Sequence, residues 1–185
     1  GYVKSVRESS DRLFKMLDNI LDISRMEAGH MKPDLAKIKA GEFLSSAAES
    51  FRALFEEKGV QLVVETGSSG KMEFSADSSL LRRVIENLLS NAWKFTPSGG
   101  KVTASAGMEK GALVFSVSDT GPGIPSDQLE AVFEKYKRLK SGEGEAGFGL
   151  GLAIARKIVE LHRGPISVSQ APGGGSAFRV VMPLA

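Results

Sequence analysis

The stretch that most constrains this chain runs from Asp77 to Gly100, because it predicts one long amphipathic helix with a polar stripe. Asp77 or Ser78 is a plausible N-cap, and Thr96-Pro97 ends the helix. Apolar residues at helical spacing must cover a core: Leu80, Leu81, Val84, Ile85, Leu88 and Leu89.

The polar stripe of this helix consists of Asn87, Asn91 and Lys94, which are spaced i, i+4, i+7 and therefore share one face. An amide oxygen is a hard ligand that suits Mg²⁺, and an ammonium group neutralises phosphate charge. The stripe thus fits a magnesium-bound polyphosphate. A solvated helix face explains these three residues equally well when they are taken alone.

The rest of the chain predicts an α+β fold. Strands are expected at 34–40, 60–65, 71–75, 102–106, 113–118, 166–169 and 177–182, and helices at 43–58, 128–136 and 152–161. Lys110-Gly111 joins two of the strands as a hairpin. Because helices and strands mix without strict alternation, we expect a two-layer sandwich, with a mixed, mostly antiparallel sheet covered on one face by helices.

Residues 1–29 predict a separate long helix with a narrow apolar seam, which ends near Gly29 and before Pro33. The seam comprises Val6, Leu13, Leu17, Ile20 and Ser24, flanked by Val3, Phe14 and Leu21. Such a seam should pack on another helix of this chain or on a second copy. We interpret the segment as half of a helical hairpin or bundle whose remainder lies in a partner chain or upstream.

The composition excludes several classes of protein and of functional site. The 185 residues carry 42% hydrophobic residues and a formal net charge of +2, so a core is possible and a general attraction to nucleic acid is not expected. The chain has no cysteine, which excludes disulfides, thiolate zinc sites and cysteine nucleophiles. No apolar run approaches the roughly 20 residues of a membrane span, and no signal peptide opens the chain. We expect a cytoplasmic location, whether or not the parent protein is attached to a membrane.

Asp119 follows a predicted strand and opens the sequence Asp-Thr-Gly-Pro-Gly. Gly121 and Gly123 let the backbone approach a ligand closely, and the carboxylate is suited to accept a hydrogen bond from an exocyclic amine such as that of a purine. Two alternatives stay open. The motif is compatible with an Asx turn, and Asp-Thr-Gly also marks aspartic proteases, although a single copy would require a homodimer.

Three glycines, Gly147, Gly149 and Gly151, alternate directly before a predicted helix. Free backbone N–H groups at the positive end of a helix dipole favour binding of a phosphate. The alternative interpretation of these glycines is a flexible linker. Residues 137–147 predict a mobile loop, and the basic residues around Tyr136 suit a solvated face, a nucleic-acid patch or side chains that close over a triphosphate. His162 is interpreted as a packed core histidine and His30 as incidental.

Five motifs in this order resemble the ATP-binding domain of sensor histidine kinases, within the gyrase, Hsp90, histidine kinase and MutL ATPase superfamily. NLLSNAWKFTPSGG is similar to its N box, DTGPGIP to its first glycine box, VFEKYKR to its F box, GFGLGLAIA to its second glycine box and GGGSAF to its third. Residues 12–30 resemble the second helix of the dimerisation and histidine-phosphotransfer hairpin. The resemblance divides the chain into residues 1–30 and an ATP-binding domain at 34–185, with a Bergerat-type fold.

The resemblance also implies a role for individual residues. Asn91 would ligate Mg²⁺, and Asp119 would accept from the adenine amine of ATP in a pocket shaped by Gly121 and Gly123. The other implied ATP-binding residues are Asn87, Lys94, Tyr136, Arg138, Gly147, Gly149, Leu150, Gly151 and Ser176. Ser176 stands where the family more often has threonine.

The activity that the resemblance implies is transfer of the γ-phosphate to a histidine, for relay to an aspartate of a response-regulator receiver domain. Neither histidine of this chain matches the family's phosphoacceptor, so we expect the acceptor hairpin to lie elsewhere in a homodimeric parent kinase and this chain to be inactive in autophosphorylation alone. The superfamily's hydrolytic members carry a glutamate where Asn87 stands, which favours phosphotransfer. A hydrolytic ATPase and a nucleotide-binding pseudokinase or interaction module are the alternatives.

Overall fold

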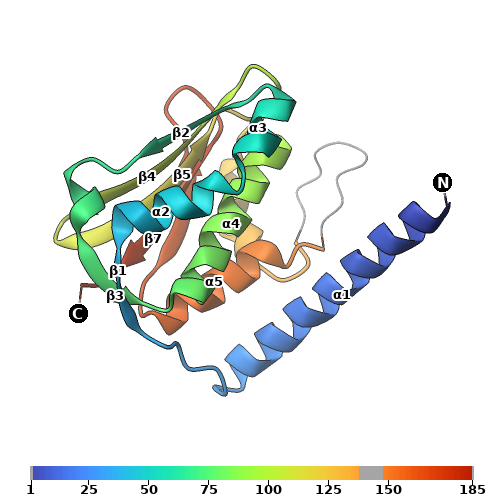
Figure 1. Ribbon diagram of the computed structural model, residues 1–185, viewed down its shortest axis with the longest axis horizontal. Coiled ribbons are helices and arrows are strands. Elements are labelled where there is room, and N and C mark those ends of the chain that lie inside the picture. Colours follow the sequence, from blue (N-terminus) through green and yellow to red (C-terminus); the bar gives the residue numbers. More distant parts are fainter. Residues whose placement is uncertain (1, 138–147, 185) are drawn as a thin grey trace.

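A computed structural model describes residues 2–137 and 148–184 of the chain (Figure 1). Its main sheet has five strands: β2 (Gln61–Glu65), β4 (Lys101–Glu109), β5 (Ala112–Asp119), β7 (Ser176–Met182) and β6 (Ile166–Gln170). They are ordered β2-β4-β5-β7-β6. β2 and β4 are parallel, and every other neighbouring pair is antiparallel. The prediction of a mixed, mostly antiparallel sheet is therefore confirmed.

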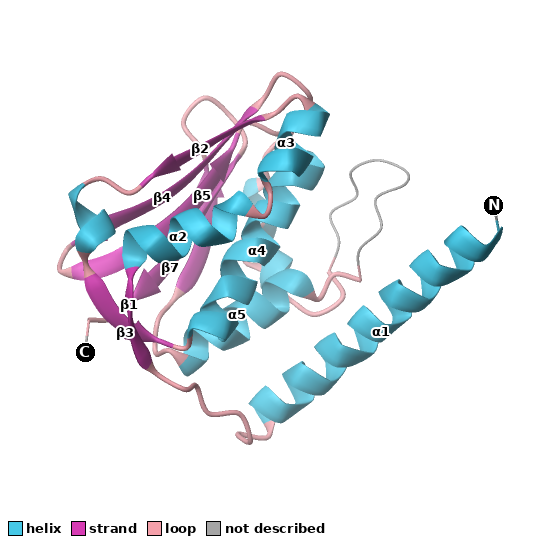
Figure 2. Ribbon diagram, viewed as in Figure 1, coloured by secondary structure: helices cyan, strands magenta, loops and turns pink. Residues whose placement is uncertain are grey.

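Helices α2 (Ala40–Glu49), α4 (Ser78–Phe95) and α5 (Gly151–Leu161) cover one face of this sheet (Figure 2). Phe115 on β5 is fully buried beneath them, and the rings of Phe43 and Phe74 pack against it with centroids 5.7 Å and 5.6 Å away. Ser116 and Ser118 alternate with the buried residues of β5 and are half-buried on the other face. This alternation produces the predicted two-layer sandwich.

A second, two-stranded sheet pairs β1 (Ala36–Lys39) with β3 (Glu73–Ala76) in antiparallel register. A 3₁₀ turn at Ser68–Lys71 precedes β3. The single helix expected at 43–58 is divided into α2 and α3 (Arg52–Lys58). The division occurs where the Ser50 hydroxyl donates to the Ala47 carbonyl at 2.9 Å, because this bond offers the backbone an alternative to the regular helix ladder.

The prediction of a helix at 128–136 is wrong. Two short 3₁₀ turns, Ser126–Gln128 and Ala131–Phe133, occupy this segment, and the backbone becomes extended at Glu134. Phe133 is buried and meets Phe178 of β7 edge-on, with ring centroids 6.3 Å apart. The buried ring holds this segment against β7, and no continuous helix forms there.

Helix α1 (Tyr2–Glu27) projects away from the two layers and meets them only near its C-terminal end (Figure 1). Ile23 and Met26 are 4% and 6% exposed there, on the side of α5. Nearer the N-terminus of α1, the apolar seam is exposed to solvent. The exposed fractions lie between 49% and 68% for Val6, Leu13, Phe14, Leu17 and Leu21. Within the two described ranges, no helix is long and apolar enough to cross a membrane.

Candidate functional site

Asp119 is the last residue of β5 and is only 6% exposed. Its Oδ1 accepts hydrogen bonds from the backbone N–H of Gly121 at 2.8 Å and of Ser176 at 3.3 Å. Burial raises the pKa of the Asp119 carboxyl group, and these two N–H donors oppose the rise because they favour the charged form. The result is a buried carboxylate in a fixed orientation, which suits recognition of a hydrogen-bond donor.

Backbone rather than side chains surrounds this carboxylate. A Cβ atom added at Gly121 would lie 2.8 Å from the carbonyl oxygen of Phe95 and 2.9 Å from Asp119 Oδ1. Gly123, with φ +76°, lies against the backbone of Gly175, where an added Cβ would be 3.1 Å from the carbonyl oxygen. These close approaches explain why glycine occupies both positions.

Gly175 is a site residue that the sequence analysis missed. It has φ +83°, and a Cβ atom there would collide with the carbonyl oxygen of Asp119. The run Gly173-Gly174-Gly175 belongs to the segment that resembles the third glycine box, and the sequence assigns no contact to it. The run of glycines in the sequence indicates a special backbone conformation. It does not identify Asp119 as the neighbour of Gly175, because that contact depends on the pairing of β7 with β5.

The polar stripe lies on α4 as predicted, and Asn87, Asn91 and Lys94 are all half-buried. Asn87 reaches the beginning of α5, where a Cβ atom on Gly151 would be 3.1 Å from its Oδ1. Phe95, at the other end of the stripe, contacts the Asp119–Gly121 turn. From residue 87 to residue 95 a helix rises about 12 Å. Asp119 therefore lies beside the C-terminal end of α4, and the α5 N-terminus lies about two turns earlier along that helix, beside Asn87.

The glycine segment before α5 is packed against residues 136 and 137. The Tyr136 N–H donates to the Gly149 carbonyl at 2.9 Å, and an added Cβ at Gly149 would lie 2.7 Å from the carbonyl oxygen of Lys137. Tyr136 itself is 60% exposed and has φ +62°. Leu150 is 2% exposed and anchors the first turn of α5 in the core. Two predicted site residues, Arg138 and Gly147, lie outside the described residues.

His162 is a buried core residue, as predicted. Its Nε2 accepts from the backbone N–H of Asp77 at 3.0 Å, and its Nδ1 lies 2.8 Å from the carbonyl oxygen of Ile158. This pair of contacts requires the neutral tautomer with the proton on Nδ1. His30, in contrast, is exposed in the turn after α1.

This arrangement suits an elongated ligand with an amine donor at the Asp119 end and negative charge at the α5 N-terminus. Residues 76–185, more than half of the chain, match the family described as histidine kinase-, DNA gyrase B- and HSP90-like ATPases. The chain belongs to this family. The fold accordingly matches that of histidine kinase ATPase domains, and the resemblance inferred from the five motifs is confirmed.

Individual relatives are sensor kinases. Hybrid signal transduction histidine kinase D of Dictyostelium discoideum is 37% identical over 186 residues, which cover 97% of this chain and 12% of that protein. Adaptive-response sensory kinase SasA of Rippkaea orientalis is 43% identical over 137 residues, 74% of this chain and 35% of that protein. The crystal structure of full-length ShkA in complex with AMPPNP superimposes with a TM-score of 0.89 and 31% identity, over 100% of this chain and 38% of that one. The chain thus spans only a minor part of these relatives.

Proposed function

We propose that this chain is the ATP-binding catalytic part of a two-component sensor histidine kinase, which delivers the γ-phosphate of ATP to a histidine that is not in this chain. The observation that carries the proposal is the buried, oriented carboxylate of Asp119 at the C-terminal end of α4, with the α5 N-terminus beside Asn87 near the middle of that helix. Membership of the ATPase family and the kinase relatives support it.

In this proposal Asp119 recognises adenine. Oδ1 is engaged by the N–H groups of Gly121 and Ser176, so Oδ2 accepts from the exocyclic amine of the base. A carboxylate in a half-buried pocket discriminates between a donor and an acceptor, because a mismatched partner leaves a buried polar group unpaired. The closely packed backbone at residues 121, 123 and 175 holds the turn that carries this carboxylate.

The phosphates are assigned to the polar stripe of α4 and the α5 N-terminus. Asn87 and Lys94 contribute polar side chains, and Gly149, Leu150 and Gly151 contribute backbone N–H groups at the positive end of the α5 dipole. Tyr136 lies beside these glycines through its bond to Gly149. Arg138 and Gly147 are assigned by resemblance alone.

Magnesium fits the donors that α4 offers. In the part of the chain that the structure describes, no group of three or more His, Asp or Glu residues could hold a metal ion. Mg²⁺ often binds through one or two protein oxygens and the substrate phosphates, and the half-buried Asn91 amide would provide such an oxygen. When bound with ATP, the ion neutralises charge on the phosphates.

The phosphoacceptor is assigned to the first helix of the phosphotransfer hairpin, which is not in this chain. His162 is 6% exposed with both ring nitrogens engaged, so it cannot approach a phosphate. Residues 1–30 are the second helix of the dimerisation and phosphotransfer hairpin, residues 34–185 are the ATP-binding domain, and the parent kinase is a homodimer that passes the phosphate to a receiver-domain aspartate. The chain alone is inactive in autophosphorylation.

Titration calorimetry with ADP and a non-hydrolysable ATP analogue, with and without Mg²⁺, tests the proposal. We expect saturable binding that Asn91→Ala weakens only in the presence of Mg²⁺, while Ser90→Ala, one position off the stripe, binds as the unmodified chain does. No binding by a folded sample would overturn the proposal. Rapid phosphate release from ATP by the chain alone would instead favour a hydrolytic ATPase.

A further inference from the structure

The last two turns of α1 are attached to the rest of the protein by polar contacts on both sides of a small apolar contact. Arg83 on α4 donates to Asn19 Oδ1 at 2.7 Å and forms an ion pair with Asp22. Ile23 and Met26 are buried between the helices. One turn further on, Glu27 Oε1 lies 2.6 Å from Lys135 Nζ.

Lys135 is adjacent to the nucleotide site proposed above. The next residue, Tyr136, donates its N–H to the Gly149 carbonyl, and its Cα lies against Gly149. A Cβ at Gly149 would be only 3.0 Å from that Cα. One short segment therefore contacts α1 through a side chain and the glycine segment through its backbone.

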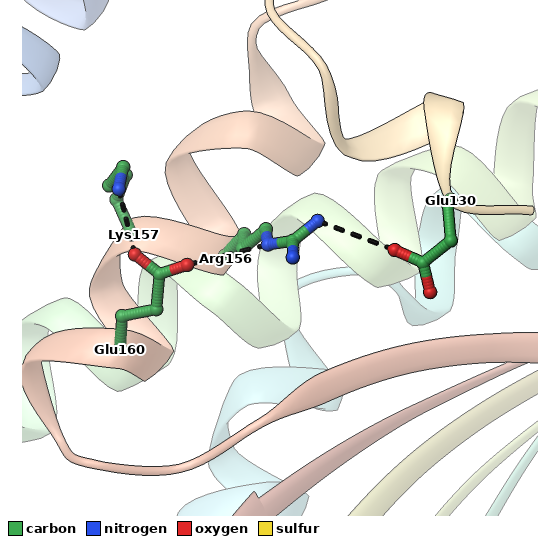
Figure 3. Close-up of polar contacts among 4 residues, drawn as sticks. All are labelled: Glu130, Arg156, Lys157 and Glu160. Carbon is green, nitrogen blue, oxygen red and sulfur yellow. Dashed lines mark hydrogen bonds and ion pairs between the residues drawn. The ribbon is translucent and has the colours of Figure 1, made fainter.

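The segment is also held from α5 (Figure 3). The Arg156 guanidinium lies 5.7 Å from the ring centroid of Phe133, and it is shared between Glu130 at 3.6 Å and Glu160 at 3.4 Å. Lys157 pairs with Glu160 at 2.8 Å. These contacts fix residues 130–133 on α5 and leave the next turn, at Lys135, to be fixed by Glu27 of α1.

The electrostatic surroundings keep Glu27 charged. The hydrogen bond from Lys135 lowers the pKa of the Glu27 carboxyl group, against a smaller effect of burial, and the positive charges of Lys135 and Lys157 add to the lowering. At neutral pH the pair is therefore an ionised bridge between α1 and the edge of the candidate site.

We propose that Glu27 is a positioning residue for the nucleotide site: through Lys135 it holds Tyr136 against Gly149, so docking of α1 and binding of nucleotide favour each other. This inference rests on the proposed nucleotide-binding function. Without the ion pair, nucleotide binding must itself supply part of the free energy that orders residues 134–137. The affinity for nucleotide is therefore lower. By linkage, nucleotide must stabilise the docked α1 by the same factor.

The test measures ADP affinity for Glu27→Lys, which places a third cation beside Lys135 and Lys157. We expect the affinity for ADP to fall about 3- to 10-fold, because the substitution replaces the attraction in a partly exposed ion pair with repulsion. The double variant Glu27→Lys/Lys135→Glu should recover most of that loss. Glu42→Lys is the matched control, because Glu42 on α2 forms an exposed pair with Lys39 at the end of β1, and this substitution should leave affinity unchanged.

A second readout follows α1 directly. Saturating ADP should slow hydrogen exchange of the amides at residues 22–27 in the unmodified chain, and this protection should be lost in Glu27→Lys and restored in the double variant. If the unmodified chain binds ADP but Glu27→Lys binds equally well without loss of protection, the positioning role is wrong and the nucleotide site stands. If the unmodified chain binds no ADP, the proposed function itself fails.

Discussion

At the scale of single residues, Asp119 combines a cost in stability with a role in binding. Asp119→Asn retains an Oδ1 acceptor for the N–H groups of Gly121 and Ser176 but removes a buried charge. We expect the variant to unfold at the same temperature as the unmodified chain or higher at pH 7. Its ADP affinity should fall about 10- to 100-fold, because the amide NH₂ would face the adenine amine donor to donor. Thermal unfolding and calorimetry on one sample check both.

The pH dependence gives the same residue a second signature. The pKa of Asp119 is raised above its ordinary value of 3.8, so between the two values the folded state binds more protons than the unfolded state. Its contribution to stability is therefore greatest below pH 3.8 and is lost as pH rises through the folded pKa. ADP affinity should change in the opposite direction, falling as pH drops and the carboxylate is neutralised. Both slopes should be absent in Asp119→Asn.

Gly175 and Gly173 form a matched pair for testing the contact that the sequence analysis missed. Both have positive φ, +83° and +88°, so alanine at either position costs about 1–2 kcal/mol of backbone strain. An added Cβ has open space at Gly173 but collides with the Asp119 carbonyl at Gly175. We expect only Gly175→Ala to abolish ADP binding. Equal affinities for the two variants would contradict the contact.

Asp119 could be predicted from sequence, and Gly175 could not. Asp119 follows directly on an apolar strand and precedes two glycines, so its place at the end of a strand is a local property. The contact of Gly175 joins positions that are distant in the chain, and it exists only because β7 pairs with β5 in a particular register. Spacing within one segment carries no information about that register.

At the scale of elements, Asp77 joins the start of α4 to the end of α5. Its Oδ1 accepts from the N–H groups of Ser79 and Leu80, and its own N–H donates to His162. We expect Asp77→Ala to lower the free energy of unfolding by about 1–2 kcal/mol through loss of the N-cap. Asp34→Ala is the control, because Asp34 uses only its backbone N–H to bond Asp77 Oδ2 and should change stability little. Denaturant unfolding measures both.

The N-cap also predicts a dependence on acid. Burial acts to raise the pKa of Asp77, but hydrogen bonds from Leu80, Ser79 and Asp34 outweigh it and lower the pKa below the ordinary value of 3.8. A lowered folded pKa means that the stabilisation is complete above pH 3.8 and is lost as pH falls through the folded pKa. The difference in stability between Asp77→Ala and the unmodified chain should therefore shrink in acid. A constant difference would contradict the capping role.

The type of an element could be predicted where the periodic spacing of apolar residues extended over a long segment. Helices α4 and α5 and the β4–β5 hairpin agree with their predicted ranges to within a few residues. Periodicity did not reveal the break between α2 and α3, because the bond from the Ser50 hydroxyl to Ala47 competes with the ladder locally. It also predicted a helix around Phe133, whose ring is instead held by Phe178 and Arg156. Tertiary contacts decided both segments.

At the scale of the whole molecule, most of α1 lies outside the packed core of the two layers. The seam predicted for this helix is only partly covered within the chain, because Ile23 and Met26 are buried whereas five apolar residues nearer the N-terminus are at least 49% exposed. Exposed apolar side chains that share a helix face favour association with another helix. A second copy of α1 offers the same face, and an interface between identical faces closes as a symmetric dimer.

We therefore expect the chain to self-associate, with a light-scattering mass that rises from 19.7 kDa towards twice that value as concentration increases. Leu17, 49% exposed at the middle of the open seam, should then be partly buried between the copies. Leu17→Glu forfeits roughly 1.5–3 kcal/mol of apolar burial and places like charges opposite each other, so dimerisation should weaken at least 10-fold.

Leu35→Glu is the control for that experiment, because Leu35 is 56% exposed but lies beyond α1. It introduces the same charge and should leave the association unchanged. A mass that stays at one chain throughout the concentration series would contradict self-association through the seam. An equal loss of association in both variants would show that the added charge, and not the seam, governs it. Only weakening confined to Leu17→Glu assigns the dimer contact to α1.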